Sequence, residues 1–211
     1  MEEKNIKNLG TTTIGIVCKD GIVLAADKRA TAGNLIMDRK TEKIHNISDD
    51  MVVTEAGNAS DAQLLIKIIK AQIKLDYMRI GKPLTVKETA NLLAGMLYNN
   101  LRKMSMMPGI AHFILGGKDR YGFHLYDLFP DGTVTKYQDF VSSGSGSVMA
   151  YGVLETLYKK DIFVNDGVKL VIKGINAAIK RDNYSGDGID VVTITKEGVK
   201  RVYKKELDYE L

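Results

Sequence analysis

The stretch NLGTTTIG at residues 8–15 places three threonines directly after a glycine. A threonine hydroxyl is a weak nucleophile unless a base lies beside it. If the bond between Gly10 and Thr11 were cut, Thr11 would carry a free α-amine with an ordinary pKa of about 7.7–8.0, which could accept the hydroxyl proton. One residue would then supply both nucleophile and base, although threonine runs are also common where a strand simply begins.

Residue spacing argues against the other usual catalytic and binding motifs. There is no G-x-S-x-G sequence, and His45, His112 and His124 lie in separate strand-like runs, so a Ser-His-Asp triad cannot be argued. The only cysteine is Cys18, and we therefore expect no metal site and no cofactor. The stretch SSGSGS at 142–147 lacks the lysine of a phosphate-binding loop, and its composition is typical of a flexible turn.

The elements that must position such a site alternate in blocks. Strand-like runs fill residues 11–57, helical periodicity fills 60–81 and 83–104, strands return over 110–140, helices over 148–160 and 166–182, and strands over 188–205. Ser60 is the expected N-cap of the first helix and Gly81 its end, while Thr85 and Glu88 have capping-box spacing in the second. Grouped strands favour an α+β fold, in which two antiparallel β-sheets are flanked by helix pairs.

Composition limits the setting of the chain. The 211 residues are 45% hydrophobic, enough for the core of one domain, and no linker or repeat divides them. A net charge of +4 without a long basic cluster argues against nucleic acid, and no apolar stretch is long enough to span a membrane. A single cysteine favours a cytoplasmic location. Residues 1–10 are polar and charged, which is typical of a leader rather than a packed element.

Six ordered fragments resemble one family. They are TTTIGIVCKDGIVLAADKRAT at 11–31, EKIHNI at 42–47, TEAGNASDAQLL at 54–65, SSGSGSVMAYGVLE at 142–155, DGVKLVIKGINAAIKRD at 166–182 and SGDGIDVVTIT at 185–195. Together they resemble the proteasome core particle β subunit of archaeal type, a member of the N-terminal nucleophile hydrolases. The resemblance implies a four-layer sandwich and a threonine endopeptidase. It also implies a propeptide at 1–10 that is removed by autolysis, followed by a single catalytic domain at 11–211.

The resemblance also implies roles for individual residues. Thr11 matches the nucleophile, and Gly10 and Thr11 flank the cleavage site. Asp27 and Lys43 match a buried acid–lysine pair that would lower the pKa of the hydroxyl. The backbone N–H of Gly57 matches the oxyanion hole. The polar groups that would orient the threonine amine are Ser145, Asp182 and Ser185.

Substrate contacts carry over in the same way. Thr31 and Gly57 match positions whose backbones pair with an extended peptide. The pocket for the side chain before the scissile bond would be formed by Ala30, His45, Val53, Glu55 and Ala59. Glu55 departs from the family, where an apolar residue is common at this position. Either its carboxylate faces water or it makes the pocket accept Lys and Arg.

The expected partners follow from the resemblance alone. They are proteasome α subunits, other β subunits in stacked heptameric rings, an unfoldase ATPase that acts through the α ring, and unfolded polypeptides as substrates. Two alternatives are a non-catalytic subunit of the ring wall and a small-molecule amidohydrolase of the same fold. The first is disfavoured because the matched polar residues around Thr11 are all present, and the second because 142–147 and 180–186 fit the proteasome pattern.

Overall fold

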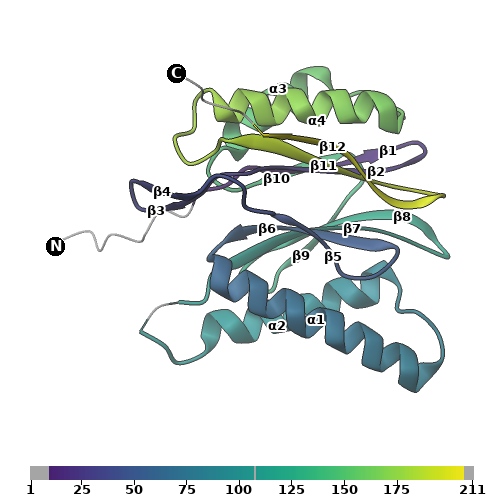
Figure 1. Cartoon of the computed structure of the whole chain (residues 1–211). Helices are drawn as coiled ribbons and strands as arrows, with labels where there is room; N and C mark the ends of the chain where they lie inside the picture. Colours follow the sequence, from purple (N-terminus) through teal and green to yellow (C-terminus); the bar gives the residue numbers. More distant parts are fainter. Residues whose placement is uncertain (1–9, 107, 207–211) are drawn as a thin grey trace.

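Two five-stranded antiparallel sheets lie face to face, and a pair of helices covers the outer face of each (Figure 1). The computed structural model describes residues 10–106 and 108–206. The elements run in the order β1 (Thr13–Cys18), β2 (Gly21–Asp27), β3 (Ala30–Ala32), β4 (Leu35–Asp38), β5 (Ile44–Asn46), β6 (Met51–Gly57), α1 (Ala59–Ile80), α2 (Val86–Arg102), β7 (Ala111–Asp119), β8 (Gly122–Leu128), β9 (Val134–Tyr137), β10 (Phe140–Ser143), α3 (Ser147–Leu157), α4 (Val164–Ile179), β11 (Gly188–Thr195) and β12 (Gly198–Glu206).

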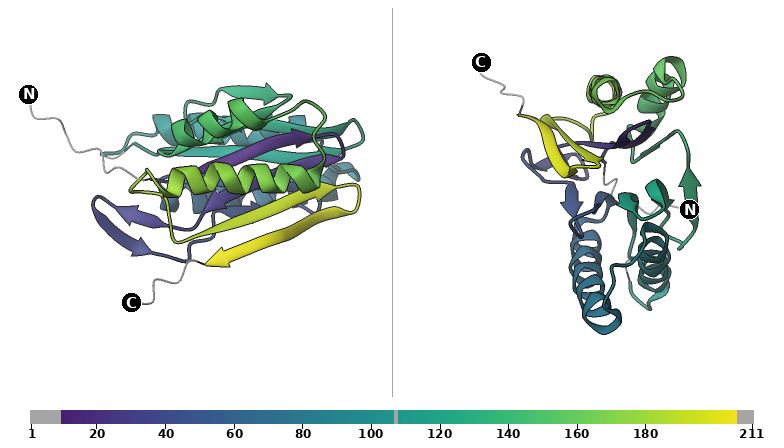
Figure 2. Two further views of the ribbon diagram at one scale, coloured as in Figure 1. Left: turned by 90° about the horizontal axis from the view of Figure 1, so that it is seen from above. Right: turned by 90° about the vertical axis from the view of Figure 1, so that its right-hand side faces the viewer.

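This arrangement confirms the predicted α+β fold and the predicted block order. The first sheet has the strand order β10-β1-β2-β11-β12 and the second has β5-β6-β7-β8-β9, while β3 and β4 form a separate two-stranded ribbon. Helices α3 and α4 lie on the first sheet and α1 and α2 on the second, so that four layers are stacked (Figures 1 and 2). None of the helices in the described ranges is long and apolar enough to cross a membrane.

Three apolar clusters fill the spaces between these layers. Strand β2 shows why: Val23 and Ala25 pack towards the cluster under α3 and α4, whereas Ile22 and Leu24 point into the cluster between the sheets. Both faces of the strand are therefore buried, which explains the continuous apolar run IVLAA in place of an alternating pattern. The third cluster lies between the second sheet and helices α1 and α2.

The observed helices begin and end within three residues of the predicted ranges. Gly81 ends α1 in the left-handed conformation at φ 74°, and Thr85 and Glu88 form the full capping box of α2. The N-cap of α1, however, is Asn58 rather than Ser60. The backbone N–H and the hydroxyl of Ser60 both donate to Asn58 Oδ1, so Ser60 already lies inside the first turn.

Strand ends bring the chemistry-bearing residues to one edge. Thr13 at the start of β1 pairs with Ala26 of β2 and with Ser143 at the end of β10. Ile189 of β11 pairs with Asp27, the last residue of β2. The first sheet therefore gathers the ends of four strands beside Thr11 and Thr12.

Candidate active site

Thr11 lies two residues before the start of β1 and is only 6% exposed. Its hydroxyl donates to the carbonyl oxygen of Gly10 at 2.7 Å, and its backbone N–H donates to Ser145 Oγ at 3.3 Å. Thr11 lines a small cavity of about 50 Å³ together with Lys43 and Gly57. The proposed nucleophile, lysine and oxyanion position thus share one cavity, although they lie far apart in the sequence.

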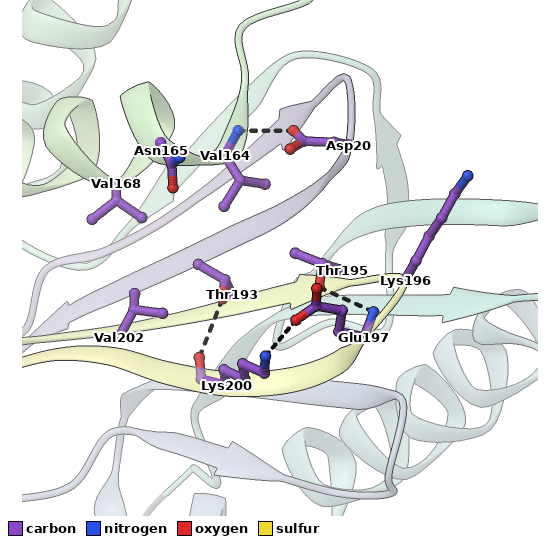
Figure 3. Close-up of a pocket in the computed structure, with 10 residues that line it drawn as sticks. All are labelled: Asp20, Val164, Asn165, Val168, Thr193, Thr195, Lys196, Glu197, Lys200 and Val202. Carbon is purple, nitrogen blue, oxygen red and sulfur yellow. Dashed lines mark hydrogen bonds and ion pairs between the residues drawn. The ribbon is translucent and has the colours of Figure 1, made fainter.

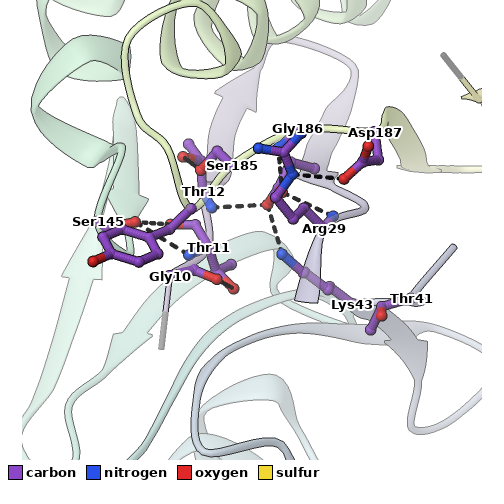
Figure 4. A network of polar contacts seen from close by, with 12 residues as sticks. Gly10, Thr11, Thr12, Arg29, Thr41, Lys43, Ser145, Ser185, Gly186 and Asp187 are labelled. Carbon is purple, nitrogen blue, oxygen red and sulfur yellow. Dashed lines mark hydrogen bonds and ion pairs between the residues drawn. The ribbon is translucent and has the colours of Figure 1, made fainter. Parts of the chain in front are cut away.

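Asp27 is fully buried and accepts four hydrogen bonds. Its Oδ1 accepts from Lys43 Nζ at 2.7 Å and from the Thr12 N–H at 2.9 Å (Figure 4). Its Oδ2 accepts from the backbone N–H groups of Arg29 at 3.0 Å and Gly186 at 2.9 Å. Lys43 is itself 3% exposed, so the ion pair is shielded from water on both sides. A carboxylate with this many donors is fixed in position, and its contact with Lys43 Nζ fixes the lysine side chain as well.

A second polar network lies on the other side of Thr11. Asp182 Oδ2 accepts from the hydroxyls of Ser145 at 2.6 Å and Ser185 at 2.7 Å. Ser185 Oγ is in turn 2.7 Å from Thr12 Oγ1. The structure therefore brings the predicted residues Ser145, Asp182 and Ser185 together, and it adds Thr12 as a partner that the sequence analysis missed.

Glycines let the backbone approach Thr11 closely. Gly144 has φ 94°, and a Cβ on it would lie 1.9 Å from the Thr11 carbonyl oxygen. A Cβ on Gly146 would lie 2.1 Å from Thr12 Oγ1. Gly57 has φ 97°, and a Cβ there would lie 2.6 Å from a backbone carbonyl oxygen. The stretch at 142–147 is therefore a close-packed wall of the site rather than a free turn.

The predicted substrate-pocket residues divide into two groups. Ala30, Thr31, Glu55, Gly57 and Ala59 line the cavity beside Thr11. Val53 and His45 do not line it. Val53 is fully buried among apolar residues under α1 and α2, and His45 Nε2 lies 3.3 Å from Glu55 Oε2. Spacing alone did not indicate the further lining residues, which are Thr41, Ala56 and Ala62.

Glu55 is buried, at 5% exposure, and does not face water. Its Oε2 lies 3.3 Å from His45 Nε2, and neither of these two buried atoms makes a hydrogen bond within the described residues. The structure therefore excludes the alternative in which the carboxylate faces water, while a pocket that accepts Lys and Arg stays a prediction. The pocket carries a carboxylate on a wall that is otherwise largely apolar.

A second depression of the described surface lacks this convergence. A depression of about 500 Å³ lies between the start of α4 and the β11–β12 hairpin, at the far end of β11 from Asp27 (Figure 3). Its polar groups bond mainly to one another, as Asp20 does with the N–H of Val164 at 2.8 Å. Over residues 10–106 and 108–206, no group of three or more His, Cys, Asp or Glu side chains could hold a metal ion.

A four-layer sandwich with a threonine at the head of an inner strand, next to a buried lysine–aspartate pair, defines the N-terminal nucleophile class of hydrolases. The family model described as "Proteasome subunit" matches residues 7–194. The "Proteasome subunit beta" of Ferroglobus placidus is 45% identical to this chain, over 94% of this chain and 93% of its own length. The "Proteasome subunit beta" of Archaeoglobus profundus is 46% identical, over 94% of this chain and 91% of its own length. "Proteasome subunit beta 2" of Pyrococcus abyssi is 44% identical, covering 94% and 93%.

The chain belongs to the proteasome subunit family, and within it to the β-type subunits of archaeal kind. This makes it a threonine protease subunit of the proteasome core particle, and a component that assembles with other proteasome subunits.

Proposed function

We propose that Thr11 is the nucleophile of this protease and that it becomes active when the chain cuts itself between Gly10 and Thr11. The hydroxyl of Thr11 already contacts the Gly10 carbonyl group, at 2.7 Å from its oxygen. Residues 1–10 are then a propeptide, and residues 11–211 are the single catalytic domain. The cut converts the Thr11 amide into a free amine, which supplies the base.

The mature site then works by acyl transfer. The Thr11 hydroxyl attacks a peptide carbonyl while the Thr11 amine takes its proton, and the Gly57 N–H stabilises the oxyanion. The leaving amine departs with a proton, and water hydrolyses the remaining ester. The Lys43 ammonium, fixed by Asp27, lowers the pKa of the hydroxyl. Ser145, Ser185 and Asp182 orient the amine.

The buried Lys43–Asp27 pair beside Thr11 is the observation that carries this proposal. Thr11→Ala and Lys43→Ala should each abolish peptide hydrolysis and self-cleavage in particles assembled with their α-type partners. Intact mass measures the loss of residues 1–10, and a fluorogenic peptide measures turnover. Lys169→Ala, which removes a lysine exposed on the surface of α4, is the matched control and should change neither. Wild-type turnover in either site variant would disprove the assigned roles.

Glu55 gives the site a preference for cleavage after Lys and Arg. A partly desolvated carboxylate favours a cationic side chain, and truncating one partner of such a pair costs about 2–5 kcal/mol. The cavity is small while Gly10 lines it, compared with about 300–1,000 Å³ for ordinary ligand sites, so loss of residues 1–10 must open it. Thr31 and Gly57 contact the backbone of the substrate peptide and hold it as an added strand. The small residues Ala30 and Ala59 leave room for the substrate side chain before the scissile bond.

The test compares kcat/KM for peptides that differ only in Arg or Leu before the scissile bond. Glu55→Gln should lower the Arg rate by about tenfold or more, with little change for Leu. Asp50→Asn, which changes an exposed carboxylate at the start of the same strand region, is the control. An unchanged Arg-to-Leu ratio in Glu55→Gln would disprove the preference but leave the catalytic roles intact.

The assembly that encloses the site consists of two stacked heptameric β rings capped by α-subunit rings, located in the cytoplasm. An unfoldase ATPase docked on the α ring would feed it unfolded polypeptides. Because the active site is enclosed in the ring assembly, only unfolded chains that enter the chamber are cleaved, and folded proteins outside it are not. Co-expression with α subunits followed by electron microscopy tests the ring number, and particles with another symmetry would disprove it.

A further inference from the structure

His112, the second residue of β7, connects the two sheets through its ring. Its Nε2 lies 2.6 Å from Asp127 Oδ1 on the neighbouring strand β8. Its Nδ1 lies 2.8 Å from Ser143 Oγ, on strand β10 of the opposite sheet. Asp127 and Ser143 are 2% and 3% exposed, so both hydrogen bonds are largely shielded from water. The proposed reaction uses none of these three residues.

The three polar side chains lie at one end of the apolar layer between the sheets. Ile114, Leu125 and Val141, each two residues away on the same strands, belong to that layer. Because side chains alternate along a strand, His112, Asp127 and Ser143 point into the same layer. At this end, a hydrogen-bonded bridge replaces apolar contact, and hydrogen bonds fix distance and direction where apolar packing does not.

The bridge connects two parts of the active site that different sheets supply. His112 pairs with Ala56 and its neighbour Ala111 pairs with Gly57, the oxyanion position. Ser143 is followed by Gly144, on which a Cβ would lie 1.9 Å from the Thr11 carbonyl oxygen, and then by Ser145, whose Oγ accepts from the Thr11 N–H. The two five-stranded sheets share no strand.

We propose that His112 is a positioning residue that holds the Gly57 oxyanion donor at a fixed distance from the Ser145 turn that orients Thr11. This inference rests on the proposed roles of Thr11, Gly57 and Ser145. The two ring nitrogens of His112 each face one partner, so a single imidazole spans Asp127 and Ser143 with two hydrogen bonds. A misplacement of about 1 Å in an active site can cost about 100-fold in rate, so a fixed bridge has a large effect on turnover.

A second hydrolytic triad does not account for the same three residues. Ser143 is almost fully buried and its backbone pairs with Thr13 in the first sheet, so a substrate carbonyl cannot reach its hydroxyl. The contacts of the bridge are therefore structural links between the two sheets, close to the Gly57 N–H and the Ser145 turn that the proposed reaction requires at a fixed separation.

The experiment measures kcat and KM separately in assembled particles. Ser143→Ala removes only the link to the Ser145 turn, and it should lower kcat about tenfold while KM stays within twofold, because the substrate pocket is untouched. His112→Gln keeps a donor for Asp127 and an acceptor for Ser143, and it should retain most of the wild-type kcat. The double variant His112→Leu with Asp127→Leu leaves no buried charge unpaired, and it should lower kcat as Ser143→Ala does while still assembling.

His124→Gln is the matched control. His124 on β8 pairs with Asp119 on β7 at 3.1 Å, at the opposite end of the same two strands, and its loss should leave kcat unchanged. Wild-type kcat in both Ser143→Ala and the double variant would overturn the positioning role. Residual peptide hydrolysis in Thr11→Ala would instead overturn the proposed function. If this residual hydrolysis disappeared in the double variant Thr11→Ala with Ser143→Ala, Ser143 would be the nucleophile.

Discussion

Replacing Asp27 by asparagine tests how the buried lysine is held. All four hydrogen bonds to Asp27 come from donors, two to each carboxylate oxygen. An asparagine must present an NH2 group to one pair or the other, so two donors would face a third donor. In either orientation Lys43, at 3% exposure, also loses its anionic partner.

The size of the effect follows from these contacts. Each hydrogen bond to a charged group contributes about 1.5–3 kcal/mol, and breaking a buried ion pair by removing one partner costs about 3–5 kcal/mol. These figures describe overlapping interactions, so they do not add. We expect Asp27→Asn to lower the free energy of unfolding by about 3–5 kcal/mol, a large share of the 5–15 kcal/mol that is typical of a domain.

Asp190 provides the matched control on the neighbouring strand β11. It is buried like Asp27, at 1% against 0% exposure, but neither of its oxygens has a hydrogen-bond partner within the described ranges. Burial raises the pKa of Asp190, while Arg201, 3.3 Å away, lowers it less. An acid whose pKa is raised by folding favours the folded state below its unfolded pKa, and loses that contribution as pH rises through the raised value. Asp190→Asn should therefore change stability by less than about 1 kcal/mol.

Urea unfolding in a Thr11→Ala background keeps the N-terminus uniform and provides the assay. The difference in free energy of unfolding between Asp190→Asn and its parent should shift in favour of the variant as pH rises above the ordinary pKa of an aspartate, about 3.9, since only the parent has a carboxyl group there to ionise. Equal unfolding midpoints for Asp27→Asn and Asp190→Asn would refute the reasoning, because burial alone would then outweigh the four donors.

Three further outcomes are expected. Gly10→Ala should slow self-cleavage, measured by intact mass, because the new Cβ would lie 1.6 Å from Tyr184 Cβ; a wild-type rate would contradict this packing. Thr85→Ala should destabilise the protein by about 1 kcal/mol in urea, since it removes the capping box with Glu88, and no change would show that the box is dispensable. Cys18, whose pKa burial raises to about 12, should react with iodoacetamide at pH 8 far more slowly when folded than in urea, and equal rates would contradict its burial.

Much of the fold could be predicted because its signals are local. The periodicity of a helix or strand is set by residues that are close together in the sequence. The same is true of the Thr85–Glu88 capping box and of the helix end at Gly81. The ribbon of β3 and β4 and the Asn58 cap depend on equally short contacts, but several residues compete for these roles. Asn58 and Ser60 are both good caps, and only the hydrogen bonds between them decide which one begins the helix.

The site required a family resemblance or a structure because its contacts are distant in the sequence. Sixteen residues separate Asp27 from Lys43, and 134 separate Thr11 from Ser145. The same distance hid the bridge at His112, whose partners lie 15 and 31 residues away. Periodicity placed Glu55 on a strand but left its environment open.

By itself, the sequence determined which faces are apolar, that Gly81 ends α1, that Thr85 and Glu88 cap α2, and that a threonine follows Gly10, because these properties are set by neighbouring residues. Only the tertiary structure decided that Glu55 is buried beside Thr11, that one carboxylate collects four donors and that His112 joins the sheets. Most of these contacts exist only after the chain has folded, since their partners come from segments that are far apart in the sequence.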